Sequence, residues 1–114
     1  MNERQAEAIV VFITTNKPEE ANRLAEILIE RRLAACVQIL PQITSVYHWQ
    51  GAVARDEEIL ILVKTTSEQF AALEQAIREN HSYTTPEIVA VPASNVSAPY
   101  LNWLKETVGE RGDQ

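Results

Sequence analysis

The chain of 114 residues contains one cysteine, three glycines and no long apolar run, and each shortage excludes a class of protein or site. A single cysteine, Cys36, cannot form an intrachain disulfide, which favours a reducing compartment. Three glycines are too few for a glycine-rich phosphate loop. No stretch approaches the roughly 20 apolar residues of a transmembrane helix, and residues 1–5 lack the basic start of a signal peptide. We therefore expect a cytoplasmic protein.

Basic residues are also in the minority, with 10 Lys and Arg against 16 Asp and Glu and a net charge of −6. Such a chain lacks the positive surface by which proteins bind duplex nucleic acid or anionic membranes. The negative net charge does not exclude the binding of cations. Its length is enough for one hydrophobic core, so we expect a single domain over residues 1–114, with loose ends at 1–7 and 109–114.

Apolar periodicity predicts the order strand, helix, strand, strand, helix, strand, followed by a terminal helix. The predicted strands are residues 8–13, 34–40 with a continuation at 43–50, 58–65 and 87–91. Helices are predicted after Pro18, after residue 66 and after Pro99. Asn16 is the expected cap of the first helix, and residues 66–69 resemble a capping box for the second. This order predicts an α+β, ferredoxin-like fold with both main helices on one face of an antiparallel sheet.

Two local signals concern the predicted hairpin between the second and third strands. Pro41 cannot donate a ladder hydrogen bond and therefore marks a bulge or a sheet edge. Gln50 and Gly51 are suited to the turn.

The third strand is apolar on both faces, because Ile59, Ile61 and Val63 alternate with Leu60 and Leu62. The helices can cover only one face, so the second face would leave a large apolar patch in water. We interpret this face as an oligomer interface. A third layer formed by the terminal helix is the competing explanation.

Five side chains are candidates for chemistry. Cys36 lies in a predicted strand, where a small buried residue is the simpler interpretation and a soft metal ligand the alternative. His81 follows a helix, which is favourable for its charge, but it is also a candidate ligand or proton carrier in a cleft. His48 is expected to be solvated. Lys64 ends a strand, and it would hold an anion if it shared a cleft with Glu87.

The aromatic residues gather at the hairpin tip and near the C-terminus, which is typical of interface anchors: Tyr47, Trp49, Tyr83, Tyr100 and Trp103. No Ser-His-Asp set, metalloprotease helix or CxxC motif is present. Glu57 and Glu58 are adjacent in a strand and therefore point apart. We expect no catalytic activity.

Several separated motifs resemble those of the CutA divalent-cation tolerance family. They are RLAACVQILP at 32–41, ITSVYHWQG at 43–51, LVKT at 62–65 after Glu58, HSYTTPEI at 81–88 and YLNWL at 100–104. The resemblance covers residues 8–105. It implies a ferredoxin-like subunit in a homotrimer similar to the PII signalling proteins, with hairpins that pair across subunits. It also implies tolerance of copper and other divalent metals, with no established catalysis.

The resemblance implies Cys36 and His81 as metal ligands, for copper or another divalent cation. It places Trp49, Lys64, Tyr83 and Glu87 in an inter-subunit cleft together with His81. The chain departs from the family pattern at residues 14–15, where some members have Cys, at residue 80, where some have a second His, and at Ser82, which replaces a Pro. The predicted function is a homotrimeric divalent-cation tolerance protein. The alternative is a PII-like trimeric sensor or scaffold that binds a small anion or a protein partner.

Overall fold

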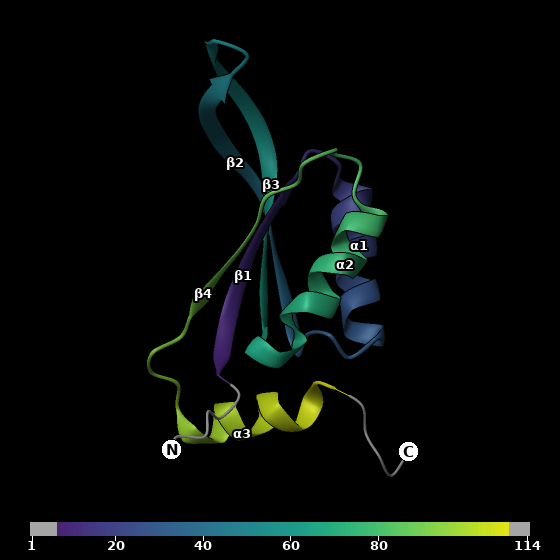
Figure 1. Ribbon diagram of the computed structural model, residues 1–114, viewed down its shortest axis with the longest axis vertical. Coiled ribbons are helices and arrows are strands. Elements are labelled where there is room, and N and C mark those ends of the chain that lie inside the picture. The colour runs from purple at the N-terminus through teal and green to yellow at the C-terminus, as the bar shows by residue number, and fades with distance from the viewer. Residues whose placement is uncertain (1–6, 110–114) are drawn as a thin grey trace.

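A computed structural model describes residues 7–109, so the predicted loose ends lie almost wholly outside the described residues. The chain runs in the predicted order of strands and helices (Figure 1). The elements are β1 (Ala8–Thr15), α1 (Pro18–Glu30), β2 (Cys36–Trp49), β3 (Ala52–Thr66), a short 3₁₀ turn (Ser67–Gln69), α2 (Phe70–Asn80), β4 (Ile88–Pro92) and α3 (Ala98–Thr107).

The four strands form one sheet in the order β2-β3-β1-β4, with every neighbouring pair antiparallel. Both α1 and α2 lie on one face of this sheet, and α3 crosses the end where β1 begins (Figure 1). This confirms the ferredoxin-like α+β prediction. None of the helices in residues 7–109 is long and apolar enough to cross a bilayer.

The core lies between the sheet and the two main helices. The sheet contributes alternate residues of β1 and β3, and each helix contributes one apolar stripe. Fully buried members are Val11, Ile13, Ile61, Val63, Leu24, Leu28, Leu73 and Ile77. Burial of each such side chain stabilises the fold by about 1.5–3 kcal/mol.

The hairpin of β2 and β3 extends beyond the rest of the sheet as an arm, residues 43–58 (Figure 1). β1 ends where Thr15 pairs with Ile59, so within the described residues the part of β3 before Ile59 pairs with β2 alone. The turn is confirmed, since Gln50 and Gly51 have positive φ of 50° and 82°, typical of a tight two-residue hairpin. The register shifts between Leu40 and Ile43 on an edge strand, which confirms the prediction for Pro41.

Three local predictions are wrong. β3 begins at Ala52 rather than at residue 58, because cross-strand pairing with β2 extends a segment that has no apolar alternation. The cap of α1 is Lys17 and not Asn16, since Pro18 at the first helical position holds the preceding residue extended. Thr66 forms no side-chain cap, and residues 67–69 form the 3₁₀ turn before α2 instead.

The face of the sheet opposite α1 and α2, called here the open face, is apolar. It carries Val10, Phe12, Leu60 and Leu62, which are half-buried, and three exposed side chains that pair with them across the strands: Leu40, Val89 and Val91. Val89 is 50% exposed and Leu40 is 40% exposed, so α3 does not cover this face. The third-layer explanation is therefore wrong, and the prediction of an uncovered apolar face is confirmed.

Candidate functional site

A groove of about 810 Å³ lies where the arm leaves the sheet. Its walls come from the end of β1, from the arm and from the loop between α2 and β4. The lining residues are Thr14, Asn16, Ser45, Val46, Tyr47, His48, Trp49, Asp56, Glu58, Tyr83, Thr84, Thr85 and Glu87. Segments far apart in the sequence therefore meet at this one place.

Hydroxyl groups hold the carboxylates of the arm in position. Asp56 and Glu58 are on the same face of β3 because strand side chains alternate. The Ser45 and Tyr83 hydroxyls donate hydrogen bonds of 2.7 Å each to the two oxygens of Glu58. The Tyr47 hydroxyl donates to Asp56. Tyr83 thereby ties the α2–β4 loop to the arm.

The charged side chains that line the groove are all acidic. Asp56, Glu58 and Glu87 line it, and no Lys or Arg is among its lining residues. Burial raises the pKa of Glu87, and the negative charge of Glu58 raises it further. Burial and the hydrogen bond to Glu58 raise the pKa of Tyr83 as well, so its hydroxyl stays a donor. This arrangement attracts cations and repels anions.

His81 lies behind Tyr83, with its side chain fully buried and the two rings 4.7 Å apart. Its Nε2 is 2.8 Å from the Thr14 carbonyl oxygen, which only accepts, so Nε2 carries the proton. Its Nδ1 accepts a 3.0 Å hydrogen bond from the Tyr83 backbone N–H. Both ring nitrogens are therefore engaged within the chain, and a metal ion would have to displace one of these partners.

Glu20 joins His81 to the start of α1. The carboxylate is 4% exposed, lies 3.3 Å from His81 Nδ1 and accepts three hydrogen bonds. The donors are the Thr15 hydroxyl at 2.7 Å, and the backbone N–H and hydroxyl of Ser82 at 3.1 Å each. Burial raises the pKa of Glu20, but the hydrogen bonds from Thr15 and Ser82 outweigh it, and the pKa lies below its ordinary value.

The structure brings together only part of the predicted cleft. Trp49, Tyr83 and Glu87 line the groove, and His81 lies directly behind it. Lys64 does not line the groove. It pairs with Val10, which is four residues before the groove residue Thr14 in β1, a distance of about 13 Å along the strand. No anion site of Lys64 and Glu87 therefore forms within one chain.

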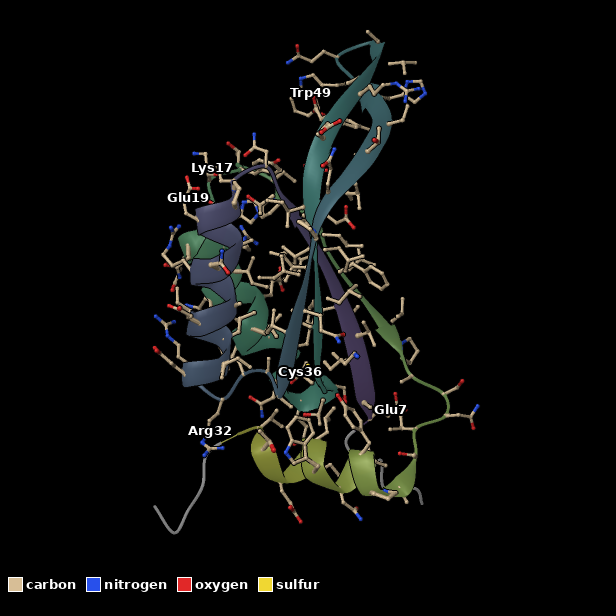
Figure 2. The ribbon with its side chains drawn as sticks, turned by 180° about the vertical axis from the view of Figure 1, so that it is seen from behind. Glu7, Lys17, Glu19, Arg32, Cys36 and Trp49 are labelled. Atoms are coloured by element: carbon tan, nitrogen blue, oxygen red, sulfur yellow. The ribbon has the colours of Figure 1, made fainter. Side chains whose placement is uncertain are left out.

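Cys36 is separated from His81 in the same way, since it pairs with Lys64 at the far end of β2. Figure 2 shows Trp49 near the arm tip and Cys36 at the opposite end of the strand, close to α3. Cys36 is half-buried rather than fully buried. Within one chain Cys36 and His81 cannot share a metal ion. His48 is exposed, as predicted.

Sequence reasoning missed the carboxylates of the arm. Asp56 and Glu58 are two positions apart, a spacing that places both on one strand face, but this signal needs a strand that begins before residue 58. The prediction that Glu57 and Glu58 point apart is confirmed, since Gln42 donates to Glu57 while Ser45 donates to Glu58. Within residues 7–109, no three His, Cys, Asp or Glu side chains converge closely enough for a preformed metal centre.

Comparison with known proteins places this geometry in a family. The family model described as "CutA1 divalent ion tolerance protein" matches residues 9–107. The divalent-cation tolerance protein CutA of Thermus thermophilus is 49% identical over 88% of this chain and 97% of its own length. Its solved structure superposes with a TM-score of 0.87 at 48% identity, covering 90% of this chain and 99% of that one.

A chloroplastic CutA 1 protein of rice is 42% identical over 90% of this chain, which spans only 58% of that protein's length. The family match covers far more than half of the described residues. The chain belongs to the CutA1 divalent-ion tolerance family.

Proposed function

We propose that this divalent-cation tolerance protein acts as a homotrimer that binds divalent metal ions in the groove at the base of the arm. One observation carries the proposal: the groove holds Asp56, Glu58 and Glu87 and has no basic lining residue to neutralise them. Carboxylate oxygens bind divalent cations, and His48 at the rim adds an imidazole for softer ions. The protein would act by binding, without catalysis, in the cytoplasm.

A second subunit would complete the metal site. One chain supplies no group of three converging ligands within its described residues. The open face is continuous with the groove, because Glu58 and Leu60 are two positions apart in β3 and therefore lie on the same side of the strand. Burial of this face between copies would remove its exposed Val89, Val91 and Leu40 from water. A trimer of PII-like architecture would then place each groove at a subunit boundary.

The test is calorimetric titration of chelator-stripped protein with Cu²⁺, the ion that leads the affinity order for nitrogen and oxygen ligands. Light scattering on the same sample measures the mass, and we expect a trimer with about one ion per chain. Glu87→Gln should weaken binding. Glu57→Gln is the matched control, because this carboxylate is on the other face of β3 and bonds Gln42.

Variants of the two other candidate ligands locate the ion. His81→Ala and Cys36→Ser should bind Cu²⁺ more tightly than Glu87→Gln does. If either of them loses binding while Glu87→Gln keeps it, the ion lies outside the groove and the proposal is overturned. Absence of saturable heat from an intact trimer would overturn it as well.

A further inference from the structure

The terminal helix α3 has little apolar packing of its own. Among its ten residues only Leu104 is buried. This side chain is not part of the cluster that fills the space between the sheet and the two main helices. A helix of this length is unstable by itself in water. Contacts made by other parts of the chain are therefore needed to hold α3 across the end of the sheet (Figure 1).

The C-terminal end of α3 is bound by one residue of the turn between α1 and β2. Arg32 Nη1 donates a hydrogen bond of 2.5 Å to the Thr107 carbonyl oxygen. The Arg32 carbonyl oxygen accepts a hydrogen bond of 2.8 Å from the Gly109 N–H. The last carbonyls of a helix have no partner within the helix, and a positive charge beside them interacts favourably with the helix dipole. Arg32 thus satisfies the end of α3 with both its side chain and its backbone.

The backbone of Arg32 has a conformation that favours glycine, with φ of 59°. Two hydrogen bonds at the end of α1 require this conformation. The Arg32 N–H donates to the Ile29 carbonyl, and the Leu33 N–H donates to the Leu28 carbonyl. This pattern usually has glycine at the left-handed position, because a Cβ is unfavourable there. The arginine side chain offsets this strain only through a contact that glycine cannot make.

We propose that Arg32 is a clasp for α3. Its guanidinium holds the C-terminal end of the helix against the α1–β2 turn, and α3 opens as a unit, without unfolding of the core, when this contact is released. Local opening of an element with few buried side chains costs less free energy than global unfolding. The inference is independent of the metal-binding proposal, because the groove lies at the other end of β1, beside Thr14.

Native-state amide hydrogen exchange of the full chain, followed by NMR, tests the clasp. Arg32→Gly removes the guanidinium, keeps the backbone carbonyl that Gly109 contacts, and relieves the unfavourable φ. We expect the α3 amides to exchange about tenfold faster, in line with the loss of a hydrogen bond from a charged donor. The amides of α1 and α2 should exchange at the wild-type rate or more slowly. A residue that serves only to end α1 would give no acceleration in α3.

Three further variants provide the controls. Arg31→Ala removes the neighbouring exposed arginine, whose φ of −85° is ordinary, and should leave α3 exchange unchanged. Arg32→Asn tolerates the positive φ but is too short to replace the guanidinium, so it should match Arg32→Gly. Arg32→Lys keeps the charge without the planar fork of donors and should retain part of the protection.

Two results would overturn the inference. One is equal exchange of α3 in Arg32→Gly and Arg31→Ala, which would mean that other contacts, including those with another copy of the chain, hold the helix. The other is acceleration of α1 and α2 by the same factor as α3, which would mean that the whole fold is destabilised and that α3 does not open separately. Neither result depends on whether the chain binds Cu²⁺.

Discussion

Removal of the Glu20 side chain tests whether the buried network at the start of α1 holds the α2–β4 loop. Glu20→Ala deletes an acceptor that is 4% exposed and receives three hydrogen bonds from Thr15 and Ser82. It also removes the carboxylate that lies 3.3 Å from His81 Nδ1. The buried Thr15 hydroxyl loses its acceptor, whereas Ser82 is exposed and can bond to water.

The magnitude follows from these contacts. A hydrogen bond to a charged group contributes about 1.5–3 kcal/mol, and a buried donor left without an acceptor costs about 1–3 kcal/mol. Since water replaces Glu20 at Ser82 and the carboxylate no longer has to be desolvated, we expect a loss of about 2–4 kcal/mol per chain rather than the full sum. Glu19→Ala is the matched control, because Glu19 is exposed in the same helical turn. It should cost at most about 1 kcal/mol through the helix dipole.

The assay is guanidinium unfolding followed by circular dichroism at fixed protein concentration, since association into the proposed trimer would contribute to apparent stability. The pKa of Glu20 is lower in the folded chain than in the unfolded chain. Its stabilisation is therefore complete above the ordinary carboxyl pKa and is lost as the pH falls through the folded value. The difference between wild type and Glu20→Ala should shrink in acid. A Glu20→Ala chain as stable as Glu19→Ala at pH 7 would refute the network.

Three further predictions use other parts of the fold. Leu24→Ala should lower the free energy of unfolding by about 2–5 kcal/mol in the same assay, because Leu24 is fully buried. Leu62→Asp places a charge on the open face and should reduce the mass measured by light scattering; a mass equal to that of the wild type would contradict the proposed interface. The pKa of Glu87, followed by carboxyl NMR, should lie above its ordinary value and fall in Glu58→Gln, which removes the neighbouring charge.

The sheet and the main helices could be predicted because their apolar residues alternate with the period of each element. The first half of β3 could not, since Ala52, Arg55 and Asp56 have no such alternation and become a strand only by pairing with β2. The prediction of Asn16 as the cap of α1 was wrong for a related reason. Pro18 overrides Asn16 through its own backbone geometry, which a list of favourable cap residues does not include.

The candidate site was predicted less completely than the fold. Trp49, Tyr83 and Glu87 were found through the family resemblance, and they do line one groove. Glu58 needed the strand register, because its role depends on Ser45 across the hairpin and on a loop residue distant in sequence. The role of Glu20 could not be predicted, since the helix dipole alone explains an acidic residue in the first turn of a helix.

The departures from the family pattern have a structural consequence at the buried network. Residue 15, in the segment where some members have Cys, donates its hydroxyl to Glu20, and Ser82, in place of Pro, donates both its hydroxyl and its N–H. The same carboxylate lies beside His81, whose ring nitrogens bond Thr14 and Tyr83. At residue 15 a hydrogen-bond donor thus stands in the segment where, by the family resemblance, a Cys would be a candidate metal ligand. Because Tyr83 in turn bonds Glu58, this network positions one wall of the groove, where the unneutralised carboxylates of the chain are available for a cation.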